Sequence, residues 1–198
     1  MIILFSGTVV PQALWGQTIR KPVIAGSFYP DNPEKLRAMI SEFSTRADLA
    51  GKTIPGDWEL KALVMPHAGF VFSGPTAAHV ASYLQPTTVS KVIVMGPDHR
   101  VGFSGCAVSD AEFWETPLGK IPVHAHAHAL SKASPAFRPI PESDRLEHSI
   151  EAVLPFLQTY LENFSLIPVV TGSCHIRDTA RVLSNVMDGN TLLVVSSD

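Results

Sequence analysis

Short runs of consecutive apolar residues alternate along the chain with segments in which apolar residues recur every three or four positions. The apolar runs predict strands at Lys61–Met65, Lys91–Met95, Phe164–Val170 and Thr191–Ser196. The periodic segments predict helices at Pro33–Phe43, Gly74–Leu84, Ser149–Leu161 and Ile176–Met187. Continuous rather than alternating apolar runs are typical of strands covered on both faces. The sequence therefore predicts an α/β fold, a three-layer sandwich with a largely parallel central sheet.

Two features complicate this pattern. Between Cys106 and Val123 the runs CAVS and KIPV flank the segment DAEFWETPLG, which predicts a long-looped hairpin at the edge of the sheet. Pro155 falls inside the third predicted helix, where it should either kink the helix or mark a later start.

Composition favours one domain with a substantial core. The chain has 198 residues, of which 45% are hydrophobic and 17% charged, and this excludes disorder over most of its length. The net charge of −3 comes without runs of either sign, so a surface that tracks nucleic-acid phosphates is not expected. No apolar stretch reaches the roughly 20 residues that a transmembrane helix needs.

Residues 1–19 form an N-terminal extension ahead of the domain predicted at residues 20–198. Its apolar block Ile2–Val10 and the small residue Gly16 are typical of a cleaved secretory signal, but no basic residue precedes Arg20. Two interpretations stay open: a signal peptide, or an additional strand or irregular N-terminal extension, so the protein is expected to be either exported or cytoplasmic.

Histidine is the residue type that points to chemistry. His67 and His99 each follow a predicted strand within a turn rich in Pro and Gly, and Asp198 follows the last strand. In an open α/β sheet, ligands bind at the carboxyl ends of the strands. Two imidazoles and a carboxylate at that edge are the donors of a facial metal site, so the sequence predicts a bound divalent metal ion.

The other histidines allow less specific interpretations. His148, at the start of a predicted helix, is either an acid/base group of the same cleft or an ordinary helix-start residue. The alternating residues His124, His126 and His128 resemble a small metal-binding cluster, but a solvated loop is the better interpretation. His79 lies inside an Ala-rich helix and is expected to be structural.

The two cysteines are too few for a disulfide scaffold. Cys106 is expected in the core. Cys174 follows a predicted strand, so it is either a partly buried thiol or a metal thiolate, and a thiolate would favour copper.

Six ordered motifs carry a family resemblance. They are KPVIAGSFYPDNPEKL, MPHAGFVFSGPTAAHV, GPDHR, ETPLGKIPV, EHSIEAVLPFLQ and VVSSD. On these motifs the chain resembles the MEMO family, known in bacteria and archaea as AmmeMemoRadiSam system protein B. The resemblance implies a LigB-like fold, similar to class III extradiol dioxygenases, with a non-haem metal site. It implies that His67 and His99 are metal ligands and that His148 and Asp198 lie beside them as catalytic residues.

The chain departs from the family at its end. Family members continue beyond the SSD motif into further helices and a strand that supplies a third ligand, often a cysteine, whereas this sequence stops at Asp198. The resemblance therefore implies a domain that is incomplete at its C-terminus.

Three functions follow from these observations. The first is a metal-dependent redox enzyme of dioxygenase-like type, with iron or copper on His67 and His99, and His148 taking a proton from the substrate. The second is a non-catalytic binding or scaffold protein that takes a small molecule or peptide in the same pocket; the resemblance implies AMMECR1-like and radical-SAM partners for it. The third is an inactive fragment.

Overall fold

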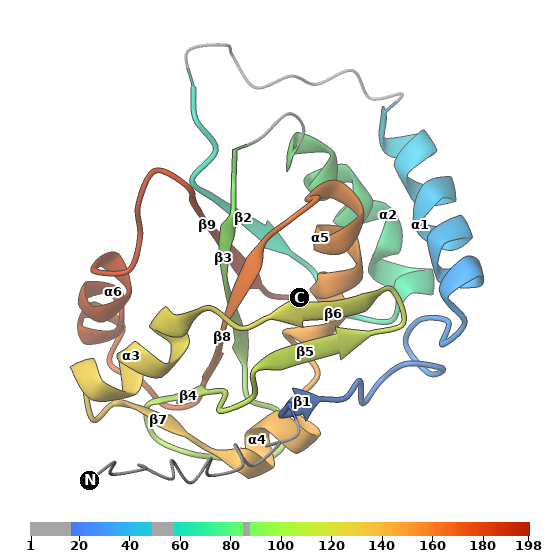
Figure 1. Cartoon of the computed structure of the whole chain (residues 1–198). Coiled ribbons are helices and arrows are strands. Elements are labelled where there is room, and N and C mark those ends of the chain that lie inside the picture. The colour runs from blue at the N-terminus through green and yellow to red at the C-terminus, as the bar shows by residue number, and fades with distance from the viewer. Residues whose placement is uncertain (1–16, 49–57, 85–87) are drawn as a thin grey trace, which may run out of the picture.

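The fold is organised around a six-stranded sheet, seen near the centre of the computed structural model, which describes residues 17–48, 58–84 and 88–198 (Figure 1). The strand order is β2-β9-β3-β8-β4-β7. The bounds of these strands are β2 Ala62–Met65, β3 Lys91–Pro97, β4 Cys106–Val108, β7 Phe137–Pro139, β8 Ser165–Thr171 and β9 Thr191–Ser196. All four strands predicted from apolar runs are present, so that part of the prediction is confirmed.

The direction of the strands determines at which edge of the sheet their carboxyl ends lie. β2, β9, β3 and β8 run parallel to one another, whereas β4 is antiparallel to β8 and pairs with β7 in parallel. The central sheet is thus largely parallel, as predicted, and its four principal strands present their carboxyl ends at one edge.

Helices cover both faces of this sheet and complete the three predicted layers. In Figure 1, α1, α2 and α5 lie on one side of it, and α3 and α6 on the other. Their bounds, with the remaining helical segments, are α1 Pro33–Asp48, α2 Phe70–Ala81, η1 Ser82–Leu84, α3 Ala125–Ala133, α4 Pro141–Leu146, η2 Glu151–Val153, α5 Leu154–Tyr160 and α6 Ile176–Ser184. Alternate residues of β3 divide between the two layers: Val92 and Val94 join one apolar cluster and Ile93 the other.

Two helices begin at residues other than those predicted from the sequence. α2 begins at Phe70, ahead of the predicted Gly74, whose missing side chain leaves room for Phe43 of α1 to pack against the helix. α5 begins at Leu154, so Pro155 lies in its first turn and marks a start rather than a kink.

The structure contains a hairpin in this region, but the prediction of its two strands is wrong. CAVS becomes β4 inside the central sheet, and KIPV pairs with part of the segment that was expected to be the loop. The hairpin is formed by β5 (Phe113–Thr116) and β6 (Gly119–Pro122), and with β1 (Ile19–Arg20) these make a separate three-stranded sheet. Trp114 of β5 is buried and packs into the main core, and its burial favours this pairing.

The N-terminal block Ile2–Val10 lies outside the described residues. Among the described residues no helix is long and apolar enough to cross a membrane.

Candidate metal centre

The parallel strands bring the predicted site residues to one edge of the sheet. β2, β9 and β3 are neighbours, and in their register Met65 lies beside Ser196 and Met95 beside Val195. His67, Asp198 and His99 follow the ends of these three strands. Segments far apart in sequence therefore deliver their polar residues to one place, as expected from the strand-end rule.

His148 reaches the same place from the turn between α4 and η2. The ring centroids of His67 and His99 are 5.2 Å apart, those of His99 and His148 4.8 Å, and those of His67 and His148 6.0 Å. His67 and His148 are buried, whereas 38% of the His99 side chain is exposed. We call His67, His99 and His148 the strand-end cluster; it is open to solvent on the His99 side.

Glu147 fixes the orientation of His99. Its Oε1 accepts hydrogen bonds from the backbone N–H groups of His148 and Ser149, at 2.8 Å each, and its Oε2 accepts from the backbone N–H of His99 at 2.6 Å. The His99 Nδ1 lies 2.9 Å from Oε1. Burial alone would raise the pKa of Glu147, but these hydrogen bonds outweigh it and lower the pKa to about 2.

The ionised Glu147 carboxylate decides the tautomer of His99. A carboxylate only accepts, so the His99 Nδ1 must carry the proton, and in the neutral ring its Nε2 is left with a lone pair. A histidine that ligates a metal through one ring nitrogen is usually held by a carboxylate or carbonyl at the other in this way.

Ser196 fixes the tautomer of His67. The Ser196 hydroxyl donates to the carbonyl of Ser149 at 2.6 Å, so its oxygen accepts from the Nδ1 of His67 at 2.9 Å. The Nε2 of His67 is again the nitrogen with the lone pair. Burial lowers the pKa of His67 and so favours the neutral ring, whereas the nearby Asp198 carboxylate acts in the opposite direction.

His148 offers a nitrogen that has no partner within the described part of the chain. Its Nδ1 is buried, makes no hydrogen bond and lies 3.4 Å from Oε1 of Glu147. Burial is also the main cause that lowers the pKa of His148, and the ring edge packs against Phe28 at a centroid distance of 5.1 Å. Such a nitrogen is available to a metal ion or to a proton.

Asp198 ties the end of β9 to the turn after β2. Its Oδ1 accepts from the backbone N–H groups of His67 and Ala68 at 2.6 Å and 3.1 Å. Its Oδ2 lies 3.5 Å from the Nε2 of His67, so the carboxylate stands beside the lone pair that a metal ion would use.

A buried ion pair supports the turn that carries Glu147. Arg20 pairs with Glu151, donates to the carbonyl oxygens of Asp144 and Glu147, and lies 4.3 Å from the centroid of the Trp114 ring. Glu151 also accepts hydrogen bonds from the β1–α1 segment, so strands, turn and segment are held together around two buried charges.

Gly96 allows this turn to approach the end of β3. A Cβ at Gly96 would lie 2.4 Å from the hydroxyl oxygen of Ser149, which donates to the carbonyl of Pro97 at 2.9 Å. The absence of a side chain at Gly96 thus brings the Glu147–Ser149 turn against the strand that carries His99.

The donor atoms of His99, Glu147 and His148 lie within 4.8 Å of one another and could hold a metal ion. Both oxygens of Glu147 already accept hydrogen bonds, so we assign it to orientation of His99. Imidazoles with a carboxylate nearby suit iron, copper or zinc.

Comparison with known proteins agrees with the motifs. A family model described as Memo-like protein matches residues 20–198. The chain belongs to the Memo-like family. A MEMO1 family protein of Methanopyrus kandleri is 37% identical over 193 residues, which cover 90% of this chain and 68% of that protein. A relative from Thermotoga neapolitana is 34% identical over 197 residues, which cover 91% of this chain and 69% of that protein.

A third MEMO1 family protein, from Thermoplasma volcanium, is 35% identical; the match covers 84% of the Memo-like chain but only 59% of that relative. The names of these relatives state the family and give no metal, substrate or reaction.

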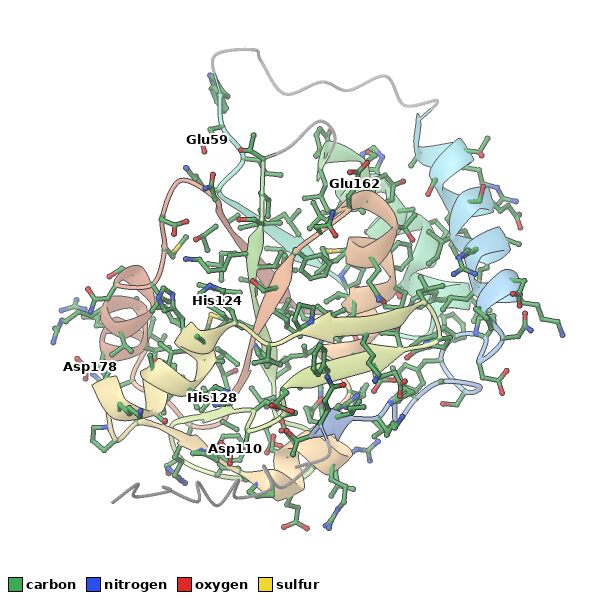
Figure 2. The ribbon with its side chains drawn as sticks, viewed as in Figure 1. Glu59, Asp110, His124, His128, Glu162 and Asp178 are labelled. Carbon is green, nitrogen blue, oxygen red and sulfur yellow. The ribbon has the colours of Figure 1, made fainter. Side chains whose placement is uncertain are left out.

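The remaining histidines of this Memo-like chain lie elsewhere. We call His124, His126 and His128 the helix run: the prediction of a solvated loop is wrong, because His124 caps α3 and the other two lie within it. Figure 2 labels His124 and His128 along α3. His79 lies in α2 with its ring against that of Tyr83.

The cysteines also lie apart from the strand-end cluster. Cys106 is fully buried, as predicted, and Cys174 packs against the same apolar cluster. The structure therefore places Cys174 with Cys106 and not among the histidines.

Sequence reasoning missed Glu147 and Ser196. Both flank residues that were singled out, but a Glu beside a His and a Ser at a strand end are common. The available signal was the position of Glu147 just ahead of the helix predicted from Ser149, where free backbone N–H groups attract a carboxylate.

Proposed function

We propose that this chain binds a divalent iron or copper ion through His67 and His99, with His148 and Asp198 beside it, and supports redox chemistry of dioxygenase-like type. The observation that carries the proposal is the pair of Nδ1 hydrogen bonds to Ser196 and Glu147, which leaves both Nε2 atoms with lone pairs before any metal arrives. Such preorganisation avoids the entropic cost of ordering ligands on binding.

The fit to a metal ion has a second support. The buried and unpartnered Nδ1 of His148 is a costly feature unless something completes it, and a metal ion or a proton would do so. When bound, an iron or copper ion with open positions supplies one-electron chemistry with O₂.

The residues around the metal would each have one task. His148, whose lowered pKa keeps it neutral, would accept a proton from the substrate. Glu147 and Ser196 would hold the ligand rings, and the Asp198 carboxylate would balance the charge of the ion.

A small-molecule substrate is consistent with the surroundings of His99. A cavity of about 520 Å³ is lined by Asp98 and Gly102 of the turn that carries His99, and by Thr171 at the end of β8. A larger cavity of about 740 Å³ lies at the other edge of the sheet, beside Ser90 and Phe164, and its lining contains no histidine.

Two measurements test the proposal. Protein loaded with Fe(II) under anaerobic conditions should consume O₂ in the presence of one of a panel of phenols and other reduced small molecules. His67→Ala should lose both metal and O₂ consumption, whereas His148→Gln should keep the metal and lose O₂ consumption. A wild-type protein that binds no iron or copper contradicts the proposal.

The partners implied by the family resemblance belong to the same proposal. If AMMECR1-like or radical-SAM proteins use this site, their co-purification with the chain should require its metal ligands. Co-purification that survives His67→Ala would favour a scaffold role instead.

A further inference from the structure

The chain contains two cysteines, and the backbone brings them to the same place. The N–H of Gly105 donates to the carbonyl of Ser173 at 2.9 Å, and the N–H of Gly172 donates to the carbonyl of Gly105 at 3.0 Å. Cys106 and Cys174 directly follow this bonded pair, at the start of β4 and in the loop between β8 and α6.

The two side chains also belong to one apolar region. Cys106 belongs to the apolar cluster that includes Ile93 and Ile167, and Cys174 packs against that cluster. Burial, followed by the electrostatic effect of Cys174, raises the pKa of the Cys106 thiol to about 11. The sulfur of Cys106 also lies 3.9 Å from the hydroxyl oxygen of Thr179 in α6.

The two thiols differ in access. Cys106 has no exposed surface, so a reagent from solvent does not reach it. Cys174 is partly exposed and can meet a dissolved oxidant. One accessible thiol beside one buried thiol is the arrangement of an attacking and a resolving cysteine.

We propose that Cys106 and Cys174 form a redox-active pair that a peroxide converts into an intramolecular disulfide. In the first step the Cys174 thiolate attacks one peroxide oxygen; the S–O bond forms, the O–O bond breaks, and hydroxide leaves as sulfur is oxidised to a sulfenic acid. In the second step the Cys106 sulfur attacks that sulfenic sulfur. The S–S bond forms, the S–O bond breaks, and the leaving hydroxide takes the Cys106 proton to give water.

This disulfide would fix one wall of the cavity beside His99. Ser104 and Ser173, which line that cavity, lie close to the two cysteines along the chain. The bridge would tie β4 to the loop after β8 and so restrict movement of the wall. The inference does not depend on the proposed metal function.

The test uses the full chain treated with a chelator, so that no bound metal contributes. Hydrogen peroxide should reduce the number of free thiols, measured after denaturation, from two to none, and the intact mass should fall by two hydrogen atoms at these sites. Peptide mapping should show Cys106 and Cys174 in one linked pair, the protein should stay monomeric on a non-reducing gel, and its Tm should rise.

Two variants separate the steps. In Cys106→Ala, peroxide should leave Cys174 as a sulfenic acid that reacts with dimedone. In Cys174→Ser, which changes a partly exposed position, the buried Cys106 should keep its free thiol. Dimedone labelling of the wild type without a linked peptide pair, disulfide-linked dimers, or two unreacted thiols would each overturn the inference.

Discussion

The strand-end cluster and the helix run each contain three histidines, and they show two different uses of the same side chain. The residues of the strand-end cluster are far apart in sequence: His67 and His99 meet because parallel strands end at one edge, and the turn between α4 and η2 brings His148 to them. The helix-run residues are neighbours in sequence, and the rings of His124 and His126 lie 4.6 Å apart, closer than any two rings of the strand-end cluster. Proximity of rings therefore does not separate the two groups.

The tautomers do separate them. The Nδ1 atoms of His67 and His99 donate, which leaves their Nε2 lone pairs free. The Nδ1 of His124 accepts from the backbone N–H of His126 at 3.1 Å, so its lone pair is used and its Nε2 carries the proton. His124 thus serves as a helix cap, and a metal ion would have to displace that cap.

The largest effect expected from this comparison concerns the support of the strand-end cluster. Glu151→Gln should destabilise the protein by about 3–5 kcal/mol, because it leaves the buried Arg20 charge without its partner. The measurement is urea unfolding of both proteins. Glu59→Gln, at an exposed ion pair with Lys61, is the matched control and should change stability by less than about 0.5 kcal/mol. Equal effects would mean that the buried network does not hold the site.

Loss of the Glu147 charge is expected to have the next largest effect. Glu147→Gln removes the negative charge and replaces one acceptor oxygen by an NH2 donor, so the His99 tautomer is held less firmly and affinity for Fe(II) or Cu(II) should fall by about 10–100-fold. Calorimetric titration gives the affinities. An unchanged affinity would show that His99 needs no orienting carboxylate.

The same residue predicts a pH dependence of folding. Because the pKa of Glu147 is lowered from 4.5 to about 2, the unfolded chain binds a proton in this interval that the folded protein does not. The stability that Glu147 contributes is complete above pH 4.5 and is lost as pH falls toward about 2. Wild-type stability should therefore fall more steeply than that of Glu147→Gln in unfolding experiments across this range.

Ser196→Ala should have a smaller effect on the metal. It frees the Nδ1 of His67 from its acceptor and allows either tautomer, which should weaken binding by about tenfold. Ser197→Ala, at the next and exposed position, is the control and should leave affinity unchanged. A larger loss in Ser197→Ala than in Ser196→Ala would contradict the assigned tautomer.

The smallest expected effect belongs to the helix run. His124→Ala should destabilise the protein by about 1 kcal/mol through loss of the N-cap of α3, and His124→Ser, which supplies a new cap, should restore most of it. Thermal unfolding measures both. If His124→Ser is no better than His124→Ala, the capping assignment is wrong.

Much of the fold, and part of the strand-end cluster, could be predicted from the sequence. Apolar runs located four strands of the sheet, and turns after them located His67, His99 and Asp198, because a strand end is marked by local sequence. The predicted pairing of CAVS with KIPV is wrong, because the pairing of β6 with β5 is favoured by burial of Trp114 in the shared core, a tertiary effect.

The helix run was missed for a local reason. The alternating histidines drew attention, whereas the intervening alanines and the following Leu130 favour a helix. The roles of Glu147 and Ser196 could not be read from sequence, since each depends on hydrogen bonds to a ring that a different strand delivers.

The most direct test of the metal site is calorimetric titration with Fe(II) under anaerobic conditions, repeated with Cu(II), on the wild type and three variants. His67→Ala and His99→Ala should each abolish the binding seen in the wild type, because each removes one of two preorganised Nε2 ligands. A triple variant with alanine at His124, His126 and His128 should bind with nearly wild-type affinity. Loss of binding in the triple variant, with binding retained in His67→Ala and His99→Ala, would contradict the account.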